Sequence, residues 1–316
     1  MNGSPSTEHP TVLVPYPGPE YADGTLDVFV YLRPESNGVA VESTILKAIR
    51  ACRASQRNID LVYMANVPGD YIVNRRIVER HYALRLFFSV AGGRAFTDDM
   101  QAQFSDFYGE PFELPRVIGA FAALRHFGWE PEELFDLWVD EDNVTRIAGQ
   151  VIKRYRDLWI VNYDIPALLH KNNAATDIAV MTFRTREGYP HFFELAREIR
   201  STLVANGLLK RDMPISRAVH ISRSPFEQLL DARDYLLNPD GSPVGVEQSS
   251  FAAFLLSQGV SRAEVNGLLN HPICGMDFEV DAPRDQNLLD LCEGFGYEDA
   301  LHIIRRVRSQ LRLPTS

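Results

Sequence analysis

The segment from Thr25 to Val90 alternates short runs of β-branched and aromatic residues with stretches of helical spacing, and this alternation constrains the fold most strongly. Apolar residues that recur every three or four positions indicate an amphipathic helix, whereas short apolar runs bounded by turn residues indicate strands. The expected strands are 26–32, 59–64 and 86–90, and the expected helices are 41–54 and 70–84. The sequence therefore predicts a β-α-β-type N-terminal layer within an α/β or α+β fold.

The rest of the chain is expected to form a helical middle, a second α/β unit and a helical C-terminus. The middle has expected helices at 98–108, 115–127 and 130–139, and residues 145–163 are ambiguous except for a strand favoured at 158–161. The second unit has expected strands at 177–183 and 218–222, with helices at 189–206 and 225–237. Three further helices are expected at 248–256, 261–269 and 297–311.

Residues 1–24 carry prolines at positions 5, 10, 15, 17 and 19 and show no periodic apolar pattern. Because proline interrupts helices, we expect an irregular Pro-rich leader, either disordered or laid across the surface as an extended arm. Residues 25–316 are expected to form a single large globular unit. A soft boundary between two packed α/β halves is placed near 140–145, at an acidic loop.

The three cysteines, Cys52, Cys274 and Cys292, form no disulfide framework and favour a reducing compartment. The N-terminal stretch lacks the apolar centre of a secretory signal, and no segment approaches the ~20 apolar residues of a membrane span. We therefore expect a soluble, cytoplasmic protein without a membrane partner. The formal net charge of −10 makes nucleic acid an unlikely partner, because an acidic surface repels phosphate.

The stretch from Arg33 to Val39, Arg-Pro-Glu-Ser-Asn-Gly-Val, is similar to the Lys-Pro-Asp-Gly-Val that follows the first strand of nucleoside diphosphate kinases. The segment Glu79-Arg80-His81-Tyr82 is also similar to a helix of that family. The resemblance concerns the N-terminal third of the chain and implies a ferredoxin-like layout. The family's catalytic histidine lies in an Asn-x-x-His-Gly-Ser-Asp motif that this sequence lacks, so phosphoryl transfer is not predicted.

Four residues near the ends of expected strands are candidates for binding an anion. Arg33 follows the strand 26–32, His170 and Asn172 precede the strand 177–183, and Arg184 follows it. Open α/β sheets bind ligands beyond their strand ends, and these side chains supply hydrogen-bond donors. A strand of that length spans roughly 23 Å, so we expect His170 and Arg184 to lie far apart. The alternative is a polar connection in which Asn172 ends a helix.

Two groups of residues have the chemistry of metal ligands but not the spacing of a compact site. The first group offers zinc-type ligands, and the second offers carboxylates for a hard cation. No Cys-x-x-Cys pair or calcium-loop pattern is present, so we predict neither a metal site nor a cofactor. The first group is His271, Cys274, Cys292 and His302, and the second is Asp277, Glu279, Asp281 and Asp285.

The sequence contains no glycine-rich phosphate loop, no Gly-x-Ser-x-Gly and no His-Glu-x-x-His. We therefore favour a non-catalytic protein that acts through self-assembly as a homo-oligomer or through interaction with a protein partner. Its aromatic residues are of the types that interfaces favour; they include Tyr16, Tyr21, Phe104, Phe107, Tyr108, Phe112, Trp129, Phe135 and Trp138. The alternative is an enzyme or binding protein for a small anionic, phosphate- or carboxylate-bearing ligand, and enzymatic activity is left open.

Overall fold

The computed structural model describes residues 9–22, 24–54, 58–213, 215–276 and 284–311. Within these ranges the chain is a mixed protein with three β-sheets, which confirms the predicted α/β or α+β class, and the largely antiparallel pairing makes α+β the closer description. The chain divides into two compact units, and each is described by itself. Unit 1 contains residues 1–77, 173–269 and 292–305, and unit 2 contains residues 78–172, 270–291 and 306–316.

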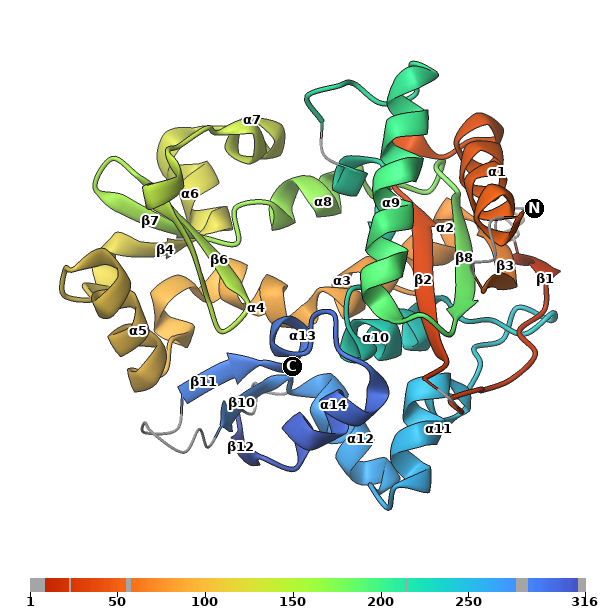
Figure 1. Ribbon diagram of the computed structural model, residues 1–316. Helices are drawn as coiled ribbons and strands as arrows, with labels where there is room; N and C mark the ends of the chain where they lie inside the picture. The colour runs from red at the N-terminus through yellow and green to blue at the C-terminus, as the bar shows by residue number, and fades with distance from the viewer. Residues whose placement is uncertain (1–8, 23, 55–57, 214, 277–283, 312–316) are drawn as a thin grey trace, which may run out of the picture. The chain divides into compact units, whose positions relative to one another are not determined.

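Unit 1 is built on a five-stranded antiparallel sheet with the strand order β1-β3-β8-β2-β9 (Figure 1). These strands are β1 (Thr11–Val14), β2 (Leu26–Leu32), β3 (Ile59–Val67), β8 (Ile178–Thr185) and β9 (Val219–Ile221). Every residue of β2 is buried, and all but one of β8 are buried. Both strands are buried because helices cover both faces of the sheet, and they are mostly apolar apart from Asp27 in β2 and Thr182, Arg184 and Thr185 in β8.

The connections in unit 1 form a split β-α-β pattern twice. Helix α1 (Val39–Ala54) joins β2 to β3, and α9 (Gly188–Ala205) joins β8 to β9. Strand β8 lies between β2 and β3, and β2 lies between β8 and β9. This is the ferredoxin-like arrangement. Its second half comes from residues 178–221, however, and not from the N-terminal third of the chain.

The two faces of this sheet differ in chemistry. Helices α1 and α9 lie side by side over one face (Figure 1), where the Phe183 and Phe192 rings have centroids 6.1 Å apart. Helices α10 (Pro225–Tyr235), α11 (Ser250–Ser257) and α14 (Tyr297–Ile304) contact the other face. There the backbone N–H of Asp27 donates to the Tyr297 hydroxyl at 3.1 Å. The second face therefore carries buried polar groups.

The leader is not irregular throughout, so that prediction is wrong for residues 11–14. These residues form β1, which pairs antiparallel with β3 at the edge of the sheet, with Thr11 opposite Asn66. Pro10 and Pro15 bracket the strand, a placement that an edge strand tolerates because its ends need not donate backbone hydrogen bonds. Within the described part of the leader, residues 11–14 are thus extended and paired with the sheet.

Strands β3 and β8 are direct neighbours, although residues 68–177 separate them in sequence; Val67 pairs with Ile178. Helix α2 (Gly69–Asn74) begins where this connection leaves the sheet. A Cβ atom on Gly69 would lie 2.6 Å from the carbonyl oxygen of Asn173, and the Gly69 N–H donates to Asp177 Oδ1 at 3.2 Å. The start and the end of the connection are therefore in backbone contact, which only glycine permits. Helix α12 (Arg262–Asn270) completes the helices mainly within unit 1.

Unit 2 contains a four-stranded sheet with the order β4-β7-β6-β5. Tight hairpins join β5 to β6 and β6 to β7, which confirms the strand favoured at 158–161 and assigns most of the ambiguous segment to strands. Phe88, Phe104 and Trp159 are among the residues of its core. Its strands are β4 (Val117–Gly119), β5 (Val144–Ile147), β6 (Gln150–Tyr155) and β7 (Leu158–Val161), and its helices include α5 (Asp98–Tyr108), α6 (Ala120–Phe127), α7 (Pro131–Asp136) and α8 (Ile165–Lys171).

The strand predicted at 86–90 is wrong: these residues belong to helix α4 (Ala83–Ala91), which follows the short helix α3 (Ile77–His81). A short apolar run fits either structure, and packing decides between them. Ser89 is fully buried and lies against β4, where a Cβ on Gly119 would lie 2.1 Å from the Ser89 carbonyl oxygen. The close approach of helix and strand therefore requires glycine at position 119.

The predicted helical C-terminus is also partly wrong. Residues 273–276, 284–287 and 307–310 form a three-stranded antiparallel sheet of unit 2, with the order β11-β10-β12. The strands are β10 (Ile273–Met276), β11 (Arg284–Asn287) and β12 (Val307–Gln310), and α13 (Leu288–Leu291) follows β11. The helix expected at 297–311 ends at Ile304, because the residues that follow pair with β10.

The boundary expected near 140–145 falls in the connection from α7 to β5, inside unit 2. Within the described ranges, no helix has both the length and the apolar character needed to cross a membrane.

Candidate functional site

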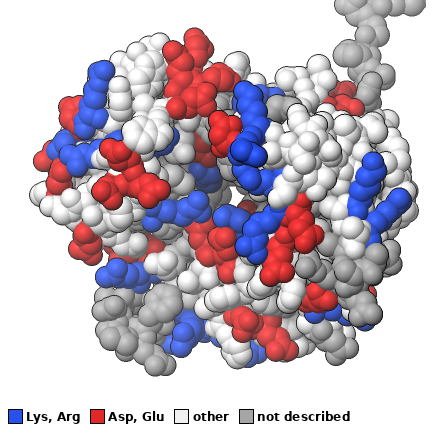
Figure 2. Space-filling model, turned by 45° about the horizontal axis from the view of Figure 1, so that its top comes forward, with Lys and Arg blue, Asp and Glu red and all other residues white. Residues whose placement is uncertain are grey.

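One face of the molecule shows whether charges of a single sign cluster there. On the face shown in Figure 2, acidic and basic side chains are interspersed. A face of this kind offers no continuous basic tract for a phosphate backbone. A specific site therefore has to be sought in a local concavity.

One such concavity lies in unit 2, between the end of β6 and the segment that joins α7 to β5. We call it the Trp138 pocket; it is an open concavity of about 250 Å³ lined by Trp138, Val139, Asp140, Asn143, Arg154, Tyr155 and Arg156. The segment that supplies the first four residues follows Leu137, where α7 has ended. The other three residues come from β6 and the tight turn that leads into β7.

A buried lysine holds the two sides of the pocket together. The Lys153 ammonium on β6 donates a hydrogen bond to the carbonyl oxygen of Leu137, directly before the pocket segment. It also lies 3.7 Å from the centroid of the Tyr163 ring. Burial lowers the pKa of Lys153, and the carboxylates of Asp164 and Asp136 partly oppose that shift. The backbone of the pocket segment is therefore fixed to β6 by a group with little freedom.

Arg156 is the cationic group of the pocket. Its guanidinium lies 5.1 Å from the centroid of the Tyr155 ring and 5.8 Å from that of Phe127. These cation–π contacts orient the guanidinium without neutralising its charge. No carboxylate in the described part of the chain lies within ion-pair distance of Arg156. Its backbone has φ 57°, a left-handed conformation that non-glycine residues rarely adopt.

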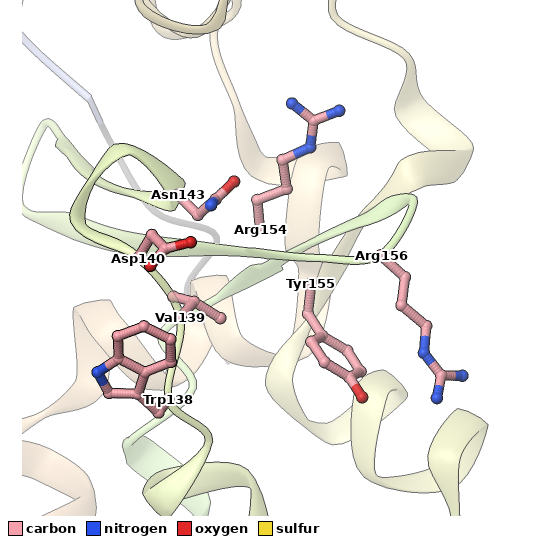
Figure 3. Close-up of a pocket in the computed structure, with 7 residues that line it drawn as sticks. All are labelled: Trp138, Val139, Asp140, Asn143, Arg154, Tyr155 and Arg156. Carbon is pink, nitrogen blue, oxygen red and sulfur yellow. The ribbon is translucent and has the colours of Figure 1, made fainter.

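Arg154 has a different role. Side chains alternate along a strand, and Figure 3 shows Arg154 extending from β6 away from Tyr155 and Arg156. Its guanidinium pairs with Glu110 at 3.0 Å and lies 5.0 Å from the centroid of the Trp159 ring. Arg154 is therefore occupied by structural contacts.

The opposite wall of the pocket presents polar groups that are available to a ligand. Trp138 is 78% exposed, although it is the largest apolar side chain type. The side chains of Asp140 and Asn143 make no hydrogen bond to any of the residues that the structure describes. In Figure 3, Asp140 and Arg156 lie on opposite sides of the pocket with Tyr155 between them. The pocket therefore has an aromatic wall, a carboxylate side and a guanidinium side.

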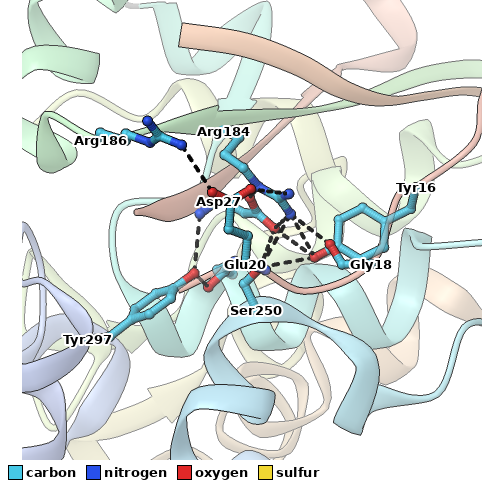
Figure 4. A network of polar contacts seen from close by, with 9 residues as sticks. Tyr16, Gly18, Glu20, Asp27, Arg184, Arg186, Ser250 and Tyr297 are labelled. Atoms are coloured by element: carbon cyan, nitrogen blue, oxygen red, sulfur yellow. Dashed lines mark hydrogen bonds and ion pairs between the residues drawn. The ribbon is translucent and has the colours of Figure 1, made fainter. Parts of the chain in front are cut away.

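The Arg184 candidate proves to be part of a buried structural network in unit 1 (Figure 4). Its Nε donates to Asp27 Oδ1 at 2.7 Å, and its other nitrogens reach Glu20 and the Gly18 carbonyl oxygen. Tyr16 and Ser250 hydroxyls also donate to Asp27. Burial acts to lower the pKa of Arg184, but the hydrogen bonds and charge of Asp27 outweigh it and raise the pKa. The Arg184 guanidinium is thus paired with the buried Asp27 carboxylate.

Within unit 1, the predicted anion ligand Arg33 does not lie beside Arg184 either. Arg33 follows β2, whereas Arg184 pairs with Asp27 at the start of β2, so about six residues, or roughly 20 Å, separate them along the strand. Arg33 lies over the Tyr31 ring at 5.6 Å. In unit 2, His170 Nδ1 contacts Glu132 Oε1 at 2.8 Å, which lowers the pKa of Glu132, and Asn172 ends α8. Anion binding at these four residues stays a prediction.

A histidine–aspartate pair in unit 1 has catalytic chemistry but little access to solvent. His220 Nε2 lies 3.0 Å from Asp231 Oδ2, and the His220 ring stacks on Tyr31 with centroids 4.2 Å apart. Asp231 is fully buried and His220 is 8% exposed. A substrate would have to displace packed side chains to reach this pair. The His220–Asp231 pair therefore stabilises the core of unit 1.

The metal-type residues do not form a cluster within the described ranges, where no group of three or more His, Cys, Asp or Glu side chains could hold an ion. His271 and Cys274 belong to unit 2, and Cys292 and His302 belong to unit 1. Burial raises the pKa of Cys274 to about 12. Asp285 accepts a hydrogen bond from Thr97, and the other three acidic candidates, at 277, 279 and 281, lie outside the described residues.

No protein-family model matches the chain, and no significant similarity links it to a curated protein or to a solved structure. Function therefore has to be inferred from the chemistry of the site alone. The sequence marked Trp138 only as one aromatic residue among many and gave Arg156 no role. The signal that could have found the pocket is the tight turn at Arg156-Asp157, between an ambiguous segment and the strand favoured at 158–161.

Proposed function

We propose that this protein is a non-catalytic binding protein and that the Trp138 pocket holds a small ligand with a carboxylate or phosphate group. The observation that carries this proposal is the Arg156 guanidinium. It is oriented by two aromatic rings at the edge of a concavity, and no acidic side chain in the described ranges neutralises it.

A guanidinium in this state suits an oxyanion. Its planar fork donates two parallel hydrogen bonds to a carboxylate or phosphate, and charge-assisted bonds of this kind are stronger than neutral ones. Because Tyr155 and Phe127 already orient Arg156, little side-chain entropy is lost when the anion binds. The exposed face of Trp138 adds apolar contact for the rest of the ligand.

The lining of the pocket supports binding rather than catalysis. Its seven residues include no histidine, cysteine, serine, threonine or lysine. Such residues supply the usual nucleophiles and the proton-transfer groups that work near neutral pH. Asp140 is the one carboxylate of the lining, and no described serine, threonine or cysteine side chain donates a hydrogen bond to it. Asp140 therefore activates no nucleophile among the described residues.

Benzoate is a suitable first probe, because it combines a carboxylate with an aromatic ring that can stack on Trp138. We expect benzoate to bind the wild-type protein in isothermal titration calorimetry and to bind Arg156→Gln at least tenfold more weakly. Arg125→Gln, at an exposed position on α6, is the matched control and should bind like the wild type. Equal benzoate affinity in wild type and Arg156→Gln would refute the proposal.

A second candidate function is self-assembly or binding of a protein partner. The observation that favours it is the residue set Trp138, Tyr155 and Arg156, since Trp, Tyr and Arg dominate the energetics of interfaces. In that case a second copy would cover Trp138. Sedimentation velocity over a wide concentration range tests self-assembly: a dimer that Trp138→Ser converts to a monomer supports it, and a monomer at all concentrations rejects self-assembly.

A further inference from the structure

We infer that two copies of this chain exchange their N-terminal arms, so that residues 11–21 of each copy bind unit 1 of the other. The arm has the character of a bound peptide, because its residues alternate between exposed and partly buried at every position from Thr11 to Tyr21. A period of two is that of an extended segment with one face against its neighbour. Extended peptides that add a strand to the edge of a sheet bind other proteins in the same way.

Two side chains anchor the arm beyond β1 (Figure 4). The Tyr16 hydroxyl donates to Asp27 Oδ2 at 2.7 Å, and the Glu20 carboxylate lies 3.1 Å from Arg184 and 3.3 Å from Arg186. Together with the paired edge of β3, these groups of unit 1 form what we call the arm site. Each contact joins the arm to residues that lie beyond the turn into β2, so it is the same whichever copy supplies the arm.

Prolines keep the arm extended. Pro15, Pro17 and Pro19 all occupy exposed positions, and their rings fix φ near the value of extended polyproline backbone. An arm whose shape is set by its own sequence loses little conformational entropy when it binds. The arm is therefore suited to leave one arm site and to bind an identical one.

The connection between the arm and β2 can act as the hinge of this exchange. The Thr25 N–H donates to the Ala22 carbonyl oxygen at 2.9 Å, and Gly24 has φ 72°, so a tight turn precedes β2. Ala22 and Gly24 are exposed. When this turn opens, its hydrogen bond is lost to water, whereas the contacts of the arm site form again with the second copy. Exchange of an identical element is for this reason a low-cost route to a dimer.

Exchange competes with the tethered arm. A segment on a short linker has an effective concentration on the order of millimolar at its own site. The exchanged dimer should therefore increase with protein concentration, and a change that disfavours the closed turn should increase it further. Because the Trp138 pocket takes no part, Trp138→Ser should leave the exchanged dimer unaffected.

Disulfide trapping between two variants detects exchange directly. Val12 lies opposite Ala65 in the β1–β3 pair, so Val12→Cys in one copy and Ala65→Cys in another come within disulfide distance when the arm of the first pairs with β3 of the second. We expect a covalent heterodimer on a non-reducing gel after oxidation of the mixed full-length proteins, one of which carries a mass tag. Leu13→Cys, at an exposed position of the same strand, is the matched control for Val12→Cys and should form far less heterodimer.

Gly24→Val tests the hinge. No atom lies within 4 Å of a Cβ at this position, so the change adds no clash, but the φ of 72° disfavours a β-branched residue in the closed turn. We expect Gly24→Val in both copies to raise the yield of covalent heterodimer by about fivefold or more, because the exchanged dimer does not need the left-handed turn. Gly259→Val is the control, since Gly259 has φ 86°, equally open surroundings and no place in the arm.

The double variant Val12→Cys/Ala65→Cys shows whether the two thiols can meet, because it should form a disulfide within one chain. Thr11→Cys/Asn66→Cys provides a second pair in the same register. Once such a bond is established, absence of heterodimer from the mixture, even with the hinge variant, would overturn arm exchange. Equal yields for Val12→Cys and Leu13→Cys would overturn it too, because they would indicate random collision. If neither pair closes within one chain, the arm does not dock on β3 and the inference also fails.

Discussion

Arg156 occupies a backbone conformation that suits glycine better than arginine. Its φ of 57° lies in the left-handed region, which costs an L-residue roughly 1–2 kcal/mol. The two-residue turn between β6 and β7 imposes this conformation. The turn also directs the Arg156 side chain to the lining of the Trp138 pocket. Strain of this kind is found at functional positions, where a useful side chain offsets a local loss of stability.

Replacing Arg156 by glycine should therefore separate stability from binding. We expect the free energy of unfolding of Arg156→Gly, measured in urea, to be unchanged or up to about 1 kcal/mol higher, because relief of strain outweighs the lost cation–π contacts. Anion binding should be lost. Arg154→Gly is the control: it removes the Glu110 pair from the interior of β6, so unfolding should become easier by about 1 kcal/mol or more. A strongly destabilised Arg156→Gly would contradict the strain argument.

Among the elements, the N-terminal arm is attached to unit 1 both by strand pairing and by a buried hydroxyl. After β1, the Tyr16 hydroxyl donates to Asp27 at 2.7 Å, and Arg184 donates to the Gly18 carbonyl oxygen at 2.8 Å. Burial raises the pKa of Tyr16, and the Asp27 carboxylate raises it further. The docked arm therefore binds the phenolic proton more tightly than the released arm does.

This difference predicts how docking of the arm depends on pH. The stabilisation from Tyr16 is complete below the ordinary tyrosine pKa of about 10 and is lost as pH rises above it. Cleavage of the arm by an alkaline protease should thus accelerate more between pH 8 and pH 11 in the wild type than in Tyr16→Phe. Tyr21→Phe, in the same arm, should behave like the wild type. Identical acceleration in wild type and Tyr16→Phe would show that this hydroxyl does not control docking.

At the scale of the whole molecule, both units depend on the C-terminal part of the chain. Unit 1 takes α14 from it, including the Tyr297 hydroxyl that binds the Asp27 backbone and Gln228. Unit 2 takes β12, an outer strand of its second sheet. Neither unit is contiguous in sequence.

A chain that ends at Leu291 should therefore lose the order of both units, not of one. We expect it to show no cooperative transition on thermal unfolding monitored by circular dichroism, because Asp27 and β10 both lose hydrogen-bond partners in the interior. A chain that ends at Leu311 retains these partners and is the matched control. A cooperative transition in the shorter chain would mean that at least one unit folds without this segment.

The sequence predicts the elements whose own residues determine them. Strands β2, β3 and β8 were found from their β-branched and aromatic runs, and α5 and α10 from their caps at Thr97 and Ser224. The segment 86–90 was assigned wrongly because a short apolar run lacks a distinctive period. Strands β1 and β12 are short and contain polar or proline-flanked sequence, so only pairing with a distant strand defines them.

The candidate site was harder to predict for the same reason. Arg184 looked like a free cation at a strand end, but antiparallel pairing of β2 with β8 brings Asp27 opposite to it. Trp138 and Arg156 line one pocket because Lys153 fixes the α7–β5 segment to β6, a contact that no local sequence pattern records. Residue types indicate chemistry, whereas strand register decides which side chains face each other.

The direct pairing of β3 with β8 bears on how the Trp138 pocket could have arisen. Residues 68–177 leave and re-enter the ferredoxin-like sheet at one hairpin position, where Gly69 touches the backbone of Asn173. Hairpin loops are the places where domains accept inserted sequence with least disturbance. An ancestral sheet with a short turn here could thus have gained the pocket by insertion, and later substitutions in the pocket would leave the inherited sheet unaltered.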